Sequence, residues 1–137
     1  MSDFPLAVQR LIRKRSGGVC EGCGVAEAKE MHHCQYRSRL GPSTAGNGLH
    51  LCGWGNTSGC HGTAHDGEKG EKRGWSIRSG HDPLLVPKLL VVSFVEIWMM
   101  LDDEGGRRPI TEGEAIERMA HIGVAVERRT PVKAVTW

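Results

Sequence analysis

The five cysteines and seven histidines of this 137-residue chain limit its fold more than any other feature. Aromatic residues make up only 5% of the sequence, so the hydrophobic core must be small. Small domains with small cores usually depend on disulfide bonds or a bound metal for stability. The N-terminal apolar stretch is too short for a secretory signal, and no apolar run is long enough to cross a membrane. We therefore expect a cytoplasmic protein whose cysteine pairs bind metal in a reducing environment.

Four of the cysteines form two pairs that suit a zinc ion. Cys20 and Cys23 have the spacing of a metal-binding turn, and Cys52 and Cys60 flank a glycine-rich segment. Four thiolates from two such turns match the tetrahedral geometry of a structural zinc site. The sequence therefore predicts a structural Zn²⁺, with disulfide-bonded or simply buried pairs as the alternative.

Two points about the cysteines remain open in the sequence. The second spacing is wider than in most zinc turns, which leaves room for a mixed site that recruits His61 or His65. The fifth cysteine, Cys34, is interpreted as a small buried apolar side chain beside the site.

Turn residues and apolar periodicity predict an α+β fold. A helix is expected over residues 1–16, with Asp3 as its cap. Two short strands, over 29–35 and 48–52, should enclose a loop that contains glycine and proline. A short helix over 61–73 should follow them.

The second half of the chain carries β-branched and aromatic residues, an acidic glycine-rich turn and a capping-box pattern. These features predict a buried strand over 91–101, a hairpin of 98–102 with 107–110, a helix from Thr111 to about 122, and a loose tail over 127–137. The chain thus divides into an N-terminal helix (1–17), a zinc-stabilised core (18–74), a strand and hairpin extension of the same domain (75–110), and a C-terminal helix and tail (111–137).

Three motifs follow one another within the predicted core. The pair His32-His33 opens a basic loop. Residues 47–53 have the form N-x-x-x-L-C-G, and residues 59–62 have the form G-C-H-G. In this order the motifs resemble the HNH endonucleases of the ββα-metal, or His-Me finger, superfamily. The likeness is closest to phage-type members with a four-cysteine zinc site, and it extends more weakly over 18–110.

The resemblance implies a ββα-metal finger that hydrolyses DNA with one divalent metal ion. His33 would be the general base for the attacking water, and Asn47 would hold the loop that aims it. His32 and His61 would bind the catalytic ion, which is Mg²⁺, Mn²⁺ or Ni²⁺. His32 stands where many members have Asp, and a neutral imidazole suits Mn²⁺, Ni²⁺ or Zn²⁺ better than Mg²⁺. His65, one helical turn after His61, is a further possible ligand or phosphate contact.

Basic residues near this site predict contacts with DNA. Arg37 and Arg39 follow the histidine pair and can contact phosphates beside the scissile bond. A second basic cluster closes the first predicted helix and consists of Arg10, Arg13, Lys14 and Arg15. Each cluster also has a plainer interpretation as a solvated surface. The resemblance further implies 5′-phosphate and 3′-hydroxyl products, and a terminase partner in DNA packaging.

Two functions of other kinds compete with the nuclease. One is a non-catalytic, zinc-stabilised module that binds nucleic acid. The other is a zinc-dependent protein-interaction domain that docks through residues 91–101. The net charge of +2 does not discriminate between these three functions.

Overall fold

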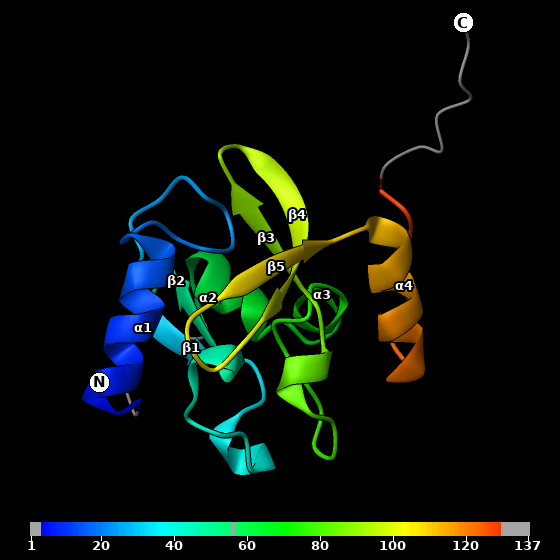
Figure 1. The fold of residues 1–137 in the computed structure, drawn as a ribbon, viewed down its shortest axis with the longest axis horizontal. Coiled ribbons are helices and arrows are strands. Elements are labelled where there is room, and N and C mark those ends of the chain that lie inside the picture. The colour runs from blue at the N-terminus through cyan, green and yellow to red at the C-terminus, as the bar shows by residue number, and fades with distance from the viewer. Residues whose placement is uncertain (1–3, 56, 130–137) are drawn as a thin grey trace, which may run out of the picture.

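The structure is a computed structural model that describes residues 4–55 and 57–129. It is a small α+β fold with two antiparallel sheets (Figure 1). Along the described residues the helices and strands are α1 (Leu6–Ser16), β1 (Glu30–His33), β2 (Gly48–Leu51), α2 (Gly59–Ala64), α3 (Gly67–Lys72), β3 (Lys88–Val92), β4 (Val95–Leu101), β5 (Arg107–Ile110) and α4 (Glu112–His121). Single 3-10 turns lie at η1 (Arg37–Arg39), η2 (Ala45–Asn47) and η3 (Pro83–Leu85).

The first helix begins later than the sequence predicted. Pro5 takes the N-cap position and provides no side-chain cap, and Asp3, the predicted cap, lies outside the described residues. The helix ends as predicted at Gly17, whose left-handed backbone lets its N–H reach the carbonyl of Arg13. Its apolar face buries Ile12 against a small cluster with Phe4.

The first sheet pairs β1 with β2, and both strands are slightly shorter than predicted. The register places His33 opposite Gly48 and Glu30 opposite Leu51. A Cβ at Gly48 would lie 2.6 Å from the end of the Ile12 side chain. Glycine therefore allows α1 to pack closely on this sheet.

The prediction of one continuous helix over 61–73 is wrong. The chain forms two helices there, α2 and α3, with a break at His65 and Asp66. The break lets α3 turn back so that Gly70 meets the end of α2. A Cβ at Gly70 would lie 2.3 Å from the carbonyl oxygen of Ala64. Close packing between backbones thus decides this turn.

The single strand predicted over 91–101 is also wrong. The chain reverses at Ser93 and Phe94, so β3 and β4 form a hairpin in which Val92 pairs with Val95. Both turn residues have positive φ, of 51° and 66°, a conformation that hairpin turns usually give to Asn-Gly. The sequence has no such residues here, so it carried no turn signal.

The predicted hairpin of β4 with β5 and the predicted final helix are confirmed. Leu101 pairs with Arg107 across the acidic turn. Thr111 caps α4 by accepting a hydrogen bond from the Glu114 N–H over 3.1 Å, and the helix ends just before Gly123. Of the predicted tail, residues 127–129 form no helix or strand, and 130–137 lie outside the described residues.

The main core joins both sheets, although the two sheets are separate. Its largest members come from β2, from the segment after α3, from β3 and β4, and from α4: Leu49, Leu51, Trp75, Ile77, Leu90, Trp98 and Met119. In Figure 1, α1 and α4 lie on opposite sides of the second sheet. None of the helices among the described residues is long and apolar enough to span a membrane.

Candidate metal centres and substrate cavity

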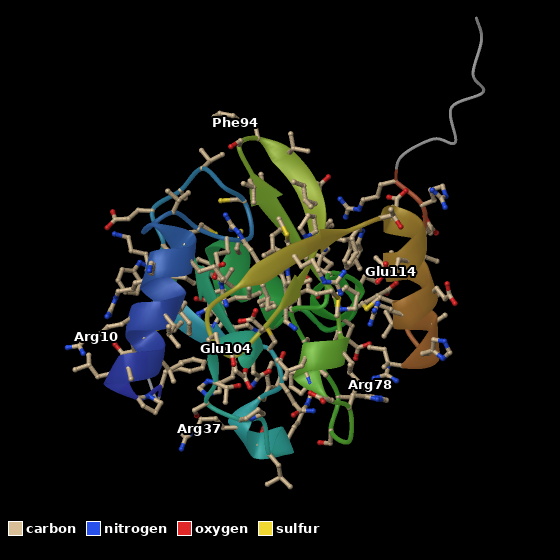
Figure 2. The ribbon with its side chains drawn as sticks, viewed as in Figure 1. Arg10, Arg37, Arg78, Phe94, Glu104 and Glu114 are labelled. Atoms are coloured by element: carbon tan, nitrogen blue, oxygen red, sulfur yellow. The ribbon has the colours of Figure 1, made fainter. Side chains whose placement is uncertain are left out.

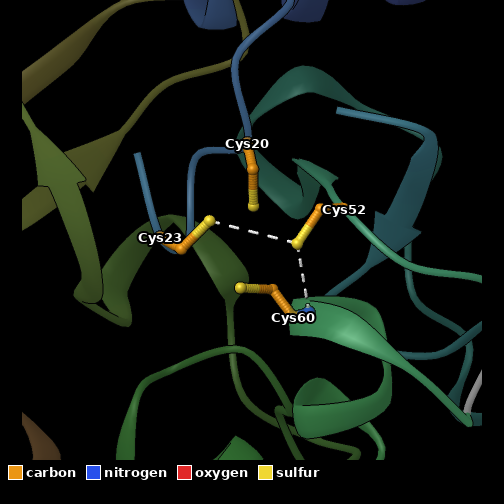
Figure 3. A group of neighbouring side chains, drawn as sticks. All are labelled: Cys20, Cys23, Cys52 and Cys60. Atoms are coloured by element: carbon orange, nitrogen blue, oxygen red, sulfur yellow. Dashed lines mark hydrogen bonds between the residues drawn. The ribbon is translucent and has the colours of Figure 1, made fainter. Parts of the chain in front are cut away.

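The four cysteines predicted to bind zinc point at a common centre (Figure 3). Cys20 and Cys23 come from the turn after α1, Cys52 follows β2, and Cys60 lies at the start of α2. The four sulfur atoms all lie within 4.8 Å of one another, and those of Cys23 and Cys52 are 4.0 Å apart. Two sulfur ligands of a tetrahedral zinc ion lie about 3.8 Å apart, since each bond is about 2.3 Å. The cluster can therefore hold a structural metal ion such as zinc.

Hydrogen bonds connect the cysteines of this cluster. The backbone N–H of Cys60 donates to the sulfur of Cys52 over 3.4 Å. This bond favours the Cys52 thiolate, but burial outweighs it and raises the pKa of Cys52. A hydrogen bond from the Cys60 thiol lowers the pKa of Cys20 to about 4, and the same contact together with burial raises the pKa of Cys60. All five cysteines are free thiols, so the disulfide alternative is wrong. Cys34 is fully buried outside the cluster, where burial raises its pKa to about 11.

A buried ion pair connects α1 to the turn that carries Cys20 and Cys23. Glu21, between the first two cysteines, accepts two hydrogen bonds from Arg15 over 2.8 and 2.9 Å. Arg15 also donates to the carbonyls of Ala45 and Gly48, and Glu21 accepts from the N–H of His50. The guanidinium of Arg15 is thus enclosed within the protein, so its predicted contact with DNA is corrected here to a structural role.

Three histidines form a second group of possible metal ligands. One ring nitrogen each from His32, on β1, and from His61 and His65, at α2, lies within 4.8 Å of the other two. The Nε2 atoms of His61 and His65 are 3.3 Å apart. That separation matches two ligands of a tetrahedral ion at about 2.0 Å per bond. His61 and His65 therefore belong to this group, and the four-cysteine cluster recruits neither of them.

Two of these rings are oriented by hydrogen bonds at their second nitrogen. Nε2 of His32 lies 2.6 Å from the carbonyl oxygen of Trp75, so the ring donates there and keeps a lone pair on Nδ1. Nδ1 of His61 lies 2.9 Å from Oε1 of Glu30, which leaves the lone pair on Nε2. Metal-binding histidines typically donate their second N–H to a carbonyl or a carboxylate in this way. Burial lowers the pKa of His32 to about 3, so its ring is neutral at pH 7.

His33, the predicted general base, lies outside this histidine group. Neighbouring strand residues point to opposite faces, and the His33 ring stacks on Phe4 with centroids 4.0 Å apart and planes 15° apart. Its Nε2 lies 3.0 Å from Oγ of Ser43. These contacts hold the ring in the wall of the same cavity that the histidine group lines.

Asn47 is completely buried and holds the loop after His33. Its Oδ1 accepts a hydrogen bond from the Gln35 N–H over 2.8 Å. Its Nδ2 donates to the carbonyls of Gln35 and Pro42 over 3.0 and 2.8 Å. A backbone bond from the Cys34 N–H to the Asn47 carbonyl closes the loop further. The side chain thus fixes the segment that directly follows His33.

A cavity of about 780 Å³ joins these groups. Its walls come from α1, β1, η1, β2, the turn before α2, and α2 itself. Five histidines line it: His32, His33, His50, His61 and His65. Such a concave surface with converging polar groups is the usual setting of a binding or catalytic site.

The predicted basic residues divide into two sets around this cavity. Arg13 and Arg37 are exposed and line it, whereas Arg10 and Lys14 are exposed on α1 without lining it. Figure 2 shows Arg10 and Arg37 on the surface. Arg39 instead lies over the ring of Tyr36, with its guanidinium carbon 4.2 Å from the ring centroid, and donates to the Ile77 carbonyl. Arg39 therefore braces the loop that carries Arg37.

Sequence reasoning missed two residues of this site. The first is Glu30, which orients His61. Glu30 lies two residues before His32 on a predicted strand, and this spacing indicated that the side chains of Glu30 and His32 share one face of the strand. Its carboxylate also accepts a hydrogen bond from the Gly55 N–H. Trp54 lines the cavity from the turn between the second pair of cysteines, and its spacing gave no sign of this.

A search of protein-family models found no match to this chain, and searches of curated proteins and of solved structures found none either. Fold and site together define a small α+β protein with a four-cysteine cluster, able to hold a metal ion, beside a histidine-lined cavity. The function must therefore be inferred from these side chains.

Proposed function

We propose that this chain is a metal-dependent DNA endonuclease of the HNH type, built on a ββα-metal finger. The observation that carries the proposal is the convergence of three imidazole nitrogens, from His32, His61 and His65, in the cavity that His33 also lines. The order of β1, β2 and α2 along the chain supports the fold assignment. His65 is a third candidate ligand, in addition to the two that the resemblance implied.

The chemistry follows from these side chains. A divalent ion held by the three imidazoles would stabilise the negative charge that develops on the scissile phosphate. His33 accepts the proton of the attacking water, which is the usual role of an imidazole that acts as a general base. Phe4 and Ser43 hold its ring, and Arg37 contacts a neighbouring phosphate.

Plasmid nicking with a panel of Mg²⁺, Mn²⁺ and Ni²⁺ tests the nuclease. His33→Ala should abolish nicking without changing the fold, as judged by circular dichroism. His121→Ala is the matched control, because His121 is exposed on α4 and does not line the cavity. Nicking by His33→Ala at the rate of the unchanged protein would contradict the assignment of this site.

Metal analysis tests the four-cysteine site separately. We expect about one tightly bound zinc per chain. Cys20→Ser should lose that zinc and unfold, since zinc binding contributes folding free energy on the order of 10 kcal/mol. Cys34→Ala should keep the zinc, because Cys34 lies outside the cluster. A Cys20→Ser variant that loses zinc and stays folded would refute a structural role for the ion.

The finer implications of the resemblance stay predictions. They are the 5′-phosphate and 3′-hydroxyl ends, the order of metal preference, and a terminase partner. End-labelling of the nicked product and the metal panel test the first two. A protein that binds DNA but cuts it in no metal would instead be the non-catalytic binding module.

A further inference from the structure

Trp54 is an exposed aromatic side chain in the wall of the cavity. It is 63% exposed, whereas Trp75 and Trp98 are buried in the core. An aromatic side chain stabilises a core or an interface mainly through the apolar area that it buries. An indole left largely in solvent at a cavity wall therefore has apolar surface available for a ligand. Trp54 belongs neither to the hydrophobic core nor to the four-cysteine cluster.

The turn that carries Trp54 is fixed on both sides of the residue. The Trp54 N–H donates to Oγ of Ser58 over 2.9 Å, and the Trp54 carbonyl accepts from the N–H and the hydroxyl of Thr57. The turn lies between the cysteines of the second pair, and a Cβ at Gly53 would lie 2.0 Å from the Ser58 carbonyl oxygen. The backbone therefore presents the indole from a defined position.

One carboxylate connects this turn to the histidine group. Oε1 of Glu30 accepts hydrogen bonds from the Gly55 N–H and from Nδ1 of His61. Trp54 thus lies one residue from a contact that also orients a candidate metal ligand.

We propose that Trp54 stacks on an unpaired base next to the scissile phosphate, so that the substrate is single-stranded or locally unpaired DNA. The inference rests on the proposed nuclease function and specifies its substrate. In an intact duplex both faces of a base are covered by its neighbours, whereas an unpaired base offers a face to an aromatic ring. Arg13 and Arg37 line the same cavity, and a cationic groove with an aromatic platform is the usual means of binding single strands.

Fluorescence anisotropy tests the inference with a labelled single strand and the matching duplex. All proteins carry His33→Ala, so that the DNA stays intact. Trp54→Ala should weaken single-strand binding by about 5- to 150-fold, which is the usual effect of removing one stacking side chain. Duplex binding should change by less than about twofold, and Trp54→Phe should restore most of the lost affinity because an aromatic face remains.

Phe94→Ala is the matched control, because Phe94 is 86% exposed but lies at the tip of the β3–β4 hairpin, away from Arg37 (Figure 2). It should leave both affinities unchanged. Stacking also quenches indole fluorescence, so the single strand should quench the parent protein and not Trp54→Phe. Equal losses for single strand and duplex in Trp54→Ala, or quenching that persists in Trp54→Phe, would overturn the inference.

These results separate the two proposals. The nuclease proposal fails in the nicking assay, which depends on His33 and on added metal. The stacking proposal fails in the binding assay, which needs neither. A chain that never cuts DNA but loses single-strand affinity in Trp54→Ala would keep the stacking role and lose the nuclease.

Discussion

The buried pair of Arg15 and Glu21 gives the sharpest prediction about stability. Both side chains are only 1% exposed, and they share two hydrogen bonds. The substitution Glu21→Gln keeps the shape of the side chain and removes its charge. It leaves the guanidinium buried without a counter-charge, and it places an amide donor against Arg15 or against the N–H of His50.

The expected cost follows from this burial. Breaking a buried ion pair by neutralising one partner destabilises a protein by about 3–5 kcal/mol. With a urea m-value of about 2 kcal/mol/M, the unfolding midpoint should fall by about 1.5–2.5 M. Urea unfolding of the zinc-loaded protein, followed by circular dichroism, measures the shift directly.

The exposed pair of Arg78 and Glu71 is the control. Its side chains are 57% and 23% exposed, and it has the same two-bond geometry. Glu71→Gln should cost less than about 1 kcal/mol, because water screens the pair and solvates whichever partner remains. A Glu21→Gln variant that is no less stable than Glu71→Gln would refute the reasoning.

Three further predictions concern stability and reactivity. Asn47→Ala removes three hydrogen bonds of a fully buried side chain and should cost about 2–4 kcal/mol in urea unfolding; a loss below about 1 kcal/mol would contradict its role in the loop. Replacing Ser93 and Phe94 by Asn-Gly suits the positive φ values of their turn and should stabilise the protein by about 1 kcal/mol, so an unchanged or lower melting temperature would count against the turn. Cys34 should resist alkylation by iodoacetamide at pH 8, where a pKa of about 11 leaves roughly 0.1% thiolate, and it should react only after unfolding; mass spectrometry of the folded protein checks this.

The sequence by itself determined the features that depend on local chemistry. The two cysteine pairs, the left-handed glycine that ends α1, the turn before β5 and the cap of α4 each lie within a short segment. Their geometry depends on neighbouring residues, so residue type and spacing were enough to predict them. The α+β class follows from the same local signals.

The tertiary structure alone decided which distant side chains meet. Arg15 appears in the sequence as one of several surface cations, and only its enclosure with Glu21 turns it into a structural residue. His65 joins His32 only because α2 packs beside β1. Trp54 lines the cavity on a turn between the second pair of cysteines, and Glu30, on β1, accepts a hydrogen bond from that turn. In each case the partner lies on another element, and packing of the elements sets burial and orientation, which local spacing does not encode.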